Sequence, residues 1–232
     1  ISESTTNIMN RAFYGCSALE IIKFPSTLVT IGDKAFIRCT SLKEVHFPSS
    51  LKEIGLSAFY ECTSLKEATF EDDSSFTLIG NLAFQNCTSL TQFMFPSSLT
   101  MIGSNDFSGC TSLSEIKFCT PSSLTTIRCF AFENCSSLTQ VEIPFSVKLI
   151  ENNVFENCSS LFNVSILSST TRIDHHAFLN CVALEKISIP DSVIEIENFV
   201  FSGCSSLKEI EIPQSVKKVG EFAFSECLSL EK

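Results

Sequence analysis

Apolar residues recur along this chain at fixed positions, with a period of 23 residues. The motif Phe-x-x-Cys-x-x-Leu occurs ten times between Phe13 and Leu230, and successive motif cysteines lie 23 residues apart except at two steps of 25. A fixed period in this range is typical of a solenoid, in which each repeat packs on its neighbours rather than around one central core. We therefore predict one continuous array over residues 1–232, of about ten coils.

The alternation within one coil predicts a short strand. Leu42, Val45 and Phe47 are apolar at spacings of three and two, as expected for a strand with one buried face. Pro48 then ends the strand, because proline cannot donate to a ladder. Stacked coils place these strands side by side, so we predict a parallel sheet along one side of the array.

The rest of the coil is predicted to return through turns. Leu51 and Ile54 point inward, and Gly55 supplies a turn that would strain other residues. Ala58 and Phe59 then begin a short helical or 3₁₀ turn that leads to the next cysteine. Since 23 residues are too few for a strand, a long helix and two turns, each coil is mostly extended.

The residues on either side of the buried middle strand position point outward and form two rows. One row is Ile21, Glu44, Glu67, Gln92, Glu115, Gln140, Asn163, Lys186 and Glu209. The other is Lys23, His46, Thr69, Met94, Lys117, Glu142, Ser165, Ser188 and Glu211. These positions vary whereas the interior does not, which favours a scaffold that displays a surface; a plain solvated sheet is the alternative. The predicted partner-binding residues are Glu44, His46, Glu67, Thr69, Gln92, Met94, Glu115, Lys117, Gln140 and Glu142.

Two coils carry two extra residues each. One insertion falls in Glu71–Ser75, and the other at Cys119 and Thr120, before Pro121. Insertions in solenoids map to loops on one face, which is often the binding face. The acidic run at Glu71–Asp73 lacks the spacing of an EF-hand, so we interpret it as a solvated loop rather than a calcium site.

The motif cysteines form a structural ladder of one thiol per coil. Its members are Cys16, Cys39, Cys62, Cys87, Cys110, Cys135, Cys158, Cys181, Cys204 and Cys227. We predict ten reduced, buried thiols that act as small hydrophobes and weak donors to turn carbonyls. A row of this kind does not converge on one point, as a tetrahedral zinc site requires. Cys119 and Cys129 lie off the ladder, where a local disulfide and two free thiols both remain open.

No residue pattern indicates catalysis, a metal or a cofactor. The run Asp174-His175-His176 is interpreted as solvated turn residues, since adjacent side chains in a turn point apart. His46 lies on the outward strand face without a nucleophile at a matching position. Four glycosylation sequons begin at Asn86, Asn134, Asn157 and Asn163, and they matter only if a eukaryote secretes the chain.

The net charge of −10 argues against nucleic acid and anionic lipid as partners, because both require a basic surface. No run of 18 apolar residues is present, so no membrane insertion is expected. The chain begins and ends inside the repeat pattern, which we interpret as a segment of a longer array. Its ends lack polar caps, so end-to-end self-association or frayed terminal coils are expected.

Residues 204–227, Cys-Ser-Ser-Leu-Lys-Glu-Ile-Glu-Ile-Pro-Gln-Ser-Val-Lys-Lys-Val-Gly-Glu-Phe-Ala-Phe-Ser-Glu-Cys, resemble the BspA-like class of leucine-rich repeats. The resemblance implies a right-handed solenoid of the α/β-horseshoe type, mostly β, with a parallel sheet on its concave face. It also implies a cell-surface or secreted protein of the kind that bacteria and parasitic protists use for adhesion. Ala68 and Phe93, at strand sites that usually hold Ile or Val, depart from the pattern.

These observations predict a non-enzymatic module that binds a protein or a glycan through the concave sheet. The alternative is a passive spacer that holds another domain away from a surface. An enzyme is not expected, because no nucleophile, base and orienting acid recur near one another.

Overall fold

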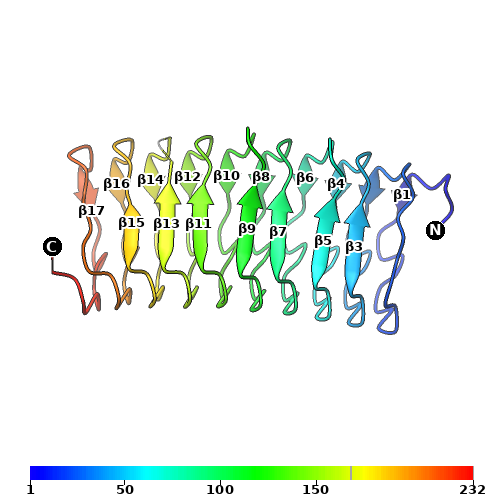
Figure 1. Cartoon of the computed structure of the whole chain (residues 1–232), viewed down its shortest axis with the longest axis horizontal. Helices are drawn as coiled ribbons and strands as arrows, with labels where there is room; N and C mark the ends of the chain where they lie inside the picture. The colour runs from blue at the N-terminus through cyan, green and yellow to red at the C-terminus, as the bar shows by residue number, and fades with distance from the viewer. Residues whose placement is uncertain (168, 232) are drawn as a thin grey trace.

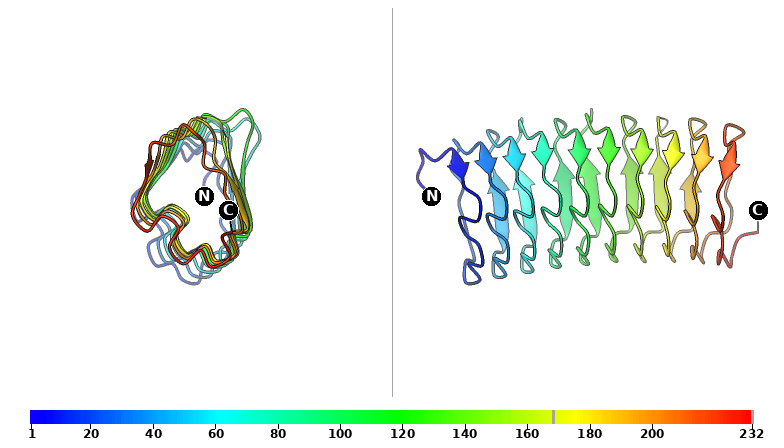
Figure 2. Two further views of the ribbon diagram at one scale, coloured as in Figure 1. Left: turned by 90° about the vertical axis from the view of Figure 1, so that its left-hand side faces the viewer. Right: turned by 180° about the vertical axis from the view of Figure 1, so that it is seen from behind.

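A computed structural model describes residues 1–167 and 169–231 of the chain. The coils stack in one row along the long axis, with the two termini at opposite ends (Figure 1). This confirms the predicted solenoid with repeats of about 23 residues. The row has two strand-bearing walls, which lie on opposite sides of it (Figure 2).

Among the described residues, the first wall carries seven strands of three or four residues, and we call it the long-strand face. Its strands are β3 (Glu44–Phe47), β5 (Glu67–Phe70), β7 (Gln92–Phe95), β9 (Glu115–Phe118), β11 (Gln140–Ile143), β13 (Asn163–Ile166) and β15 (Lys186–Ser188). Neighbouring strands pair in parallel with equivalent repeat positions opposite each other, as Val141 lies opposite Val164. This is the sheet that the alternation of Leu, Val and Phe predicts.

The second wall carries ten strands of two residues in the part of the chain that the structure describes, and we call it the short-strand face. Its strands are β1 (Asn7–Ile8), β2 (Thr30–Ile31), β4 (Glu53–Ile54), β6 (Leu78–Ile79), β8 (Met101–Ile102), β10 (Thr126–Ile127), β12 (Leu149–Ile150), β14 (Arg172–Ile173), β16 (Glu195–Ile196) and β17 (Lys218–Val219). Sequence reasoning predicted only one sheet. The second wall forms because the returning segment is itself extended, and its inward isoleucines align from coil to coil, as Ile31 does with Ile54. Its strands pair as two sheets, one from β1 to β6 and one from β8 to β17.

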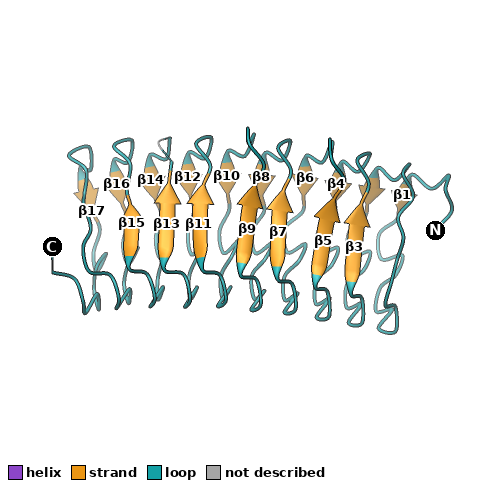
Figure 3. Ribbon diagram, viewed as in Figure 1, coloured by secondary structure: helices purple, strands orange, loops and turns teal. Residues whose placement is uncertain are grey.

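The expected helical or 3₁₀ turn before each ladder cysteine does not form. The described residues contain strands and turns but no helix (Figure 3). Ser57 and Glu61 adopt left-handed backbone angles, with φ of 54° and 57°, which interrupt a right-handed helix. Phe59 N donates to Ala83 O of the next coil at 2.8 Å instead of bonding along its own segment. Alternate N–H groups of the turn therefore bond to the next coil, while those between them keep local three-residue bonds, as Tyr60 N does to Ser57 O at 3.2 Å.

Gly55 is required for a reason other than the one expected. The backbone φ angle of Gly55 is not positive, so the turn does not require a left-handed conformation there. A Cβ atom there would lie 2.6 Å from the backbone nitrogen of Asp33 in the preceding coil. Asp33 Oδ1 accepts a hydrogen bond from Leu56 N at 2.9 Å, so this close approach also links the two coils.

The interior is a column of stacked phenylalanines from the Phe-x-x-Cys motif. Successive ring centroids from Phe13 to Phe224 lie 4.9–5.5 Å apart, with interplanar angles of at most 14°. The predicted single column, with Phe36, Phe59 and Phe84 in line, is confirmed. Neighbouring coils are thus held by aromatic contact in addition to apolar burial.

The long-strand sheet is interrupted at the two insertions. β5 and β7 are not paired, and β9 and β11 join through a single pair, Gln140 and Glu115. The unpaired step also brings the bulky Phe93 beside Ala68, where other coils carry Val or Ile. At the chain ends, Ile21 makes only an isolated bridge, and residues 207–213 form no strand. The regular face therefore ends at these four places.

Candidate binding face

The outward rows occupy the exposed side of the long-strand face. In β3 the side chains alternate, with Glu44 and His46 exposed and Val45 and Phe47 buried. The same alternation holds in β7 and β11. Sheet register sets the spacing of the displayed groups, because equivalent positions lie on adjacent strands about 4.8 Å apart.

The structure divides the ten predicted residues into two groups. Glu44, His46, Glu67 and Thr69 lie together on β3 and β5. Gln92, Met94, Glu115, Lys117, Gln140 and Glu142 lie together on β7, β9 and β11. The break between β5 and β7 separates the groups, so the rows do not form one uninterrupted stripe.

The expected acidic stripe is also interrupted in charge. Lys117 Nζ lies 2.9 Å from Glu115 Oε1, two residues away on the same strand, and offsets that carboxylate. Glu44 and Glu67 lie directly opposite each other, and like charges in that arrangement repel. The net negative field is therefore concentrated on β3 and β5 and weakens toward β9.

His46 has a hydroxyl neighbour that sequence reasoning overlooked. Its Nδ1 lies 2.7 Å from Thr69 Oγ1, at the matching position of the next coil. The statement that no nucleophile matches His46 is therefore wrong. Within the described residues no third group orients the ring, so the pair is best understood as a cross-strand hydrogen bond that holds two exposed side chains.

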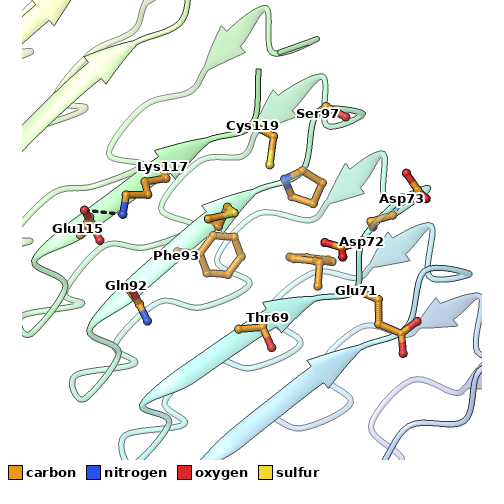
Figure 4. A pocket seen from close by; sticks show the side chains of 14 residues that line it. Thr69, Glu71, Asp72, Asp73, Gln92, Phe93, Ser97, Glu115, Lys117 and Cys119 are labelled. Carbon is orange, nitrogen blue, oxygen red and sulfur yellow. Dashed lines mark ion pairs between the residues drawn. The ribbon is translucent and has the colours of Figure 1, made fainter. Parts of the chain in front are cut away.

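Two hollows open on this face at the two insertions. The first, of about 300 Å³, lies at the break between β5 and β7, with Glu71, Asp72 and Asp73 on one side and Cys119 on the other (Figure 4). The second, of about 720 Å³, surrounds the loop at Cys119 and includes Phe145. Sequence reasoning missed the hollows, although the two 25-residue steps are the signal that marks them.

The ladder thiols form a regular hydrogen-bonded row. Nine of them donate to the carbonyl of the motif phenylalanine in the preceding coil, with Sγ–O distances of 3.1–3.3 Å. Burial raises the pKa of these thiols, to about 12 for Cys110 and about 11 for Cys39. The expectation of ten buried thiols is wrong at the ends, where Cys16 is exposed and Cys227 half-buried, because only one neighbouring coil covers each.

The two cysteines off the ladder are both free. Cys129 Sγ donates to Glu151 Oε2 at 3.1 Å, while Cys119 lines both hollows on the long-strand face. Burial raises the pKa of the Cys129 thiol, and its bond to Glu151 adds to the effect. The structure therefore has two separate thiols in place of the local disulfide.

The run that begins at Asp174 is less solvated than expected. Asp174 is buried and pairs with Arg172, with 2.7 Å between Oδ1 and Nε. His175 Nε2 lies 3.9 Å from Glu197 Oε2, whose nearer partner is Lys218 Nζ at 2.7 Å. That hydrogen bond lowers the pKa of Glu197. The interpretation of Asp174 as a solvated turn residue is therefore wrong. Acidic residues replace the turn glycine in these coils, and their side chains form ion pairs with neighbouring basic side chains.

In the described part of the chain, no three side chains of the ligating types converge to hold a metal ion. In the acidic loop, Glu71 Oε2 accepts a hydrogen bond from Ser49 N at 3.0 Å, and Asp72 and Asp73 are exposed.

The sequon residues Asn134 and Asn157 are joined by a side-chain hydrogen bond of 3.1 Å. No helix among the described residues is long and apolar enough to cross a bilayer.

Comparison with known proteins agrees with this architecture. A family model described as the BspA type leucine rich repeat region matches residues 6–135, 77–186 and 125–232. No curated protein sequence matches the chain.

Several solved structures are similar. The pneumococcal vaccine antigen PcpA is 29% identical with a TM-score of 0.64, and the match covers 94% of this chain but 56% of that one. The T. pallidum leucine-rich repeat protein TpLRR is 26% identical with a TM-score of 0.54, covering 94% and 79%. A leucine-rich repeat protein from Eubacterium ventriosum, 20% identical with a TM-score of 0.54 and coverage of 98% and 81%, supports the fold alone.

Proposed function

Since this chain belongs to the BspA-type leucine-rich repeat family, we propose that it is a non-enzymatic recognition module. It binds a protein or glycan partner through the long-strand face, which the family resemblance puts on the concave side. The observation that carries this proposal is the contrast within each strand. Buried positions hardly change between coils, whereas the exposed ones differ, as Glu44, Gln92 and Lys186 do at one repeat position.

Packing explains the constant interior but leaves the exposed residues free, so selectivity resides on them. A row of side chains at strand spacing forms a broad surface suited to a macromolecule rather than a small substrate. A catalytic role is not favoured, because the His46–Thr69 pair lacks an orienting group in the described residues and lies on an open face.

The proposed location is a cell surface. PcpA is a vaccine antigen, and an antigen used in this way must be reachable by antibodies. This chain spans only 56% of that protein's length, so the comparison supports the location of the repeat array and says nothing of an anchor.

A passive spacer is the second candidate. The observation that favours it is the extended row of coils, with the termini at opposite ends (Figure 1). A spacer needs no selective face, so it is distinguished from the recognition module by the presence of a saturable partner.

The test screens a panel of purified extracellular-matrix proteins, cell-surface proteins and glycans for binding to the 232-residue protein. A partner should bind about tenfold more weakly, by about 1.4 kcal/mol, to the variant Glu67→Lys with Glu115→Lys. The matched control is Glu53→Lys with Glu195→Lys, the same charge change on the short-strand face, which should leave the affinity unchanged. If the protein is a spacer, none of the screened molecules should bind it. If a partner loses affinity only for the control variant, its binding site lies on the short-strand face.

A further inference from the structure

We propose that the two hollows form one groove that holds an extended segment of a partner protein. The segment places an apolar side chain between Met94 and Phe145 and a lysine or arginine beside Glu71–Asp73. This proposal rests on the proposed function, because it names where on the long-strand face a partner binds and the chemistry that it presents.

The hollows are continuous with each other. Both are lined by Met94, Glu115, Lys117 and Cys119, so β9 and the loop after it form their common wall. Figure 4 shows this wall across from the acidic loop, with Lys117 turned toward Glu115. The groove thus crosses the strands from the β5–β7 break to the coil of β13.

Two exposed apolar side chains in the groove depart from their repeat positions. Met94 is 55% exposed, and every other residue in its outward row is polar. Phe145 is 63% exposed, and every other residue that follows a strand-ending proline is polar. Both line the second hollow. Coils with polar residues at these positions have the same strands and turns, so the fold does not require the apolar groups, whereas a ligand that covers them gains by burial.

The groove has an uncompensated negative end. The side chains of Glu71, Asp72 and Asp73 form no ion pair with any described residue, and their one described side-chain hydrogen bond runs from Ser49 N to Glu71. Lys117, the basic residue in the groove, is already paired with Glu115. A cationic group on the partner therefore complements this end, and the attraction raises the rate of association.

The length of the groove favours a peptide segment over a small molecule. From β5 to β13 there are four steps between coils, so the groove spans about 19 Å at about 4.8 Å per step. An extended chain rises about 3.3 Å per residue, and about six residues fill this length. Such a segment reaches the acidic loop and the Met94–Phe145 pair at the same time.

The probe is a phage-displayed library of random octapeptides, selected on the 232-residue protein. We expect the enriched peptides to combine a lysine or arginine with an apolar residue a few positions away. A synthetic enriched peptide is then titrated against protein labelled with ¹³C in its methionine methyl groups. The chain has three methionines, so Met94 reports on the groove while Met9 and Met101 serve as internal controls. Met94 should shift saturably and the other two should not.

Variants separate the two halves of the groove. Asp72→Lys with Asp73→Lys should weaken peptide binding at least tenfold, and Phe145→Ser should weaken it at least fivefold. The matched control, Glu209→Lys with Glu211→Lys, makes the same charge change on exposed residues of the last coil and should alter affinity less than twofold.

The proposal is overturned if no peptide is enriched, if enriched peptides lack the basic and apolar pair, or if Met9 or Met101 shifts in place of Met94. It is also overturned if the control pair matters as much as the loop pair. A screened partner could lose affinity for the variant Glu67→Lys with Glu115→Lys but bind the groove variants normally. That result would support the proposed function and contradict the groove. A peptide that shifts Met94 when none of the screened proteins and glycans binds would keep the groove and would exclude only the screened molecules as partners.

Discussion

The thiol of Cys110 donates a hydrogen bond to the backbone carbonyl of Phe84, one coil earlier, with 3.2 Å between Sγ and the oxygen. The same oxygen accepts the N–H of Cys87 at 3.1 Å, within its own coil. One carbonyl thus joins a turn to the next coil. Because the site is fully buried, the thiol satisfies an acceptor that water does not reach.

Replacing Cys110 by serine should lower the free energy of unfolding by roughly 1–3 kcal/mol, since a more polar and shorter side chain replaces a buried thiol. Urea unfolding followed by circular dichroism measures the change. Cys16→Ser is the matched control, because Cys16 is exposed at the end of the ladder and should change stability by less than about 0.5 kcal/mol. Equal effects at both positions would show that the buried bond has no special role.

Thiol reagents should distinguish the ends of the ladder from its interior. The thiolate is the reactive form, and burial raises the pKa of the interior thiols while the fold excludes the reagent. Eight thiols are buried and should react only after denaturation, whereas Cys16 should react at once in the native protein. Titration with a chromogenic disulfide at pH 8, before and after guanidinium, counts them. Fewer than twelve thiols in denaturant without reductant would mean that disulfides form.

Asp106 should make stability depend on pH. It is fully buried where most coils have alanine or valine, and its carboxylate accepts hydrogen bonds from Gly103 N at 2.6 Å and Ala83 N at 3.3 Å. Burial outweighs these bonds and raises its pKa from 3.8 to about 8. The folded state therefore binds more protons than the unfolded state between these values, so this group's contribution to stability falls as pH rises from about 4 to 8 and then levels off.

Melting temperatures at pH 5, 7 and 9 measure this effect. Asp106→Ala should raise the melting temperature most at pH 9 and least at pH 5. Glu209→Ala, which removes an exposed carboxylate, controls for the change in net charge. Parallel pH profiles for the parent protein and Asp106→Ala would contradict the prediction.

A protein of these 232 residues should associate through its end coils. β17 pairs on one side only, and Phe222 and Leu228 beside it are 61% and 78% exposed. Open strand edges with apolar neighbours favour pairing between chains. Sedimentation velocity should therefore show a weight-average coefficient that rises with concentration.

The variant Phe222→Asp with Leu228→Asp should reduce this association, since it adds charge at the end coil. Phe162→Asp, at an exposed apolar position in the middle of the array, should not. A strictly monomeric parent protein with well-protected amides in both terminal coils would refute the prediction.

The sequence by itself determined the solenoid, its period and its interior. Each coil repeats the same buried positions, so the stacking of Phe36 on Phe59 and the alignment of Cys39 with Cys62 follow from the spacing alone. The outward rows were equally predictable, because strand alternation fixes which side chains face solvent. These features depend on residues within one coil and its immediate copy.

Only the tertiary structure decided how neighbouring coils bond and where they separate. The turn at Phe59 bonds to the next coil instead of forming a helix, and the returning segments align into a second wall of paired strands. The groove brings together Met94 and Phe145, which lie two coils apart and share no motif. Its shape depends on how strand pairing is lost between β5 and β7 and reduced between β9 and β11, and a repeat pattern within one coil does not contain that pairing.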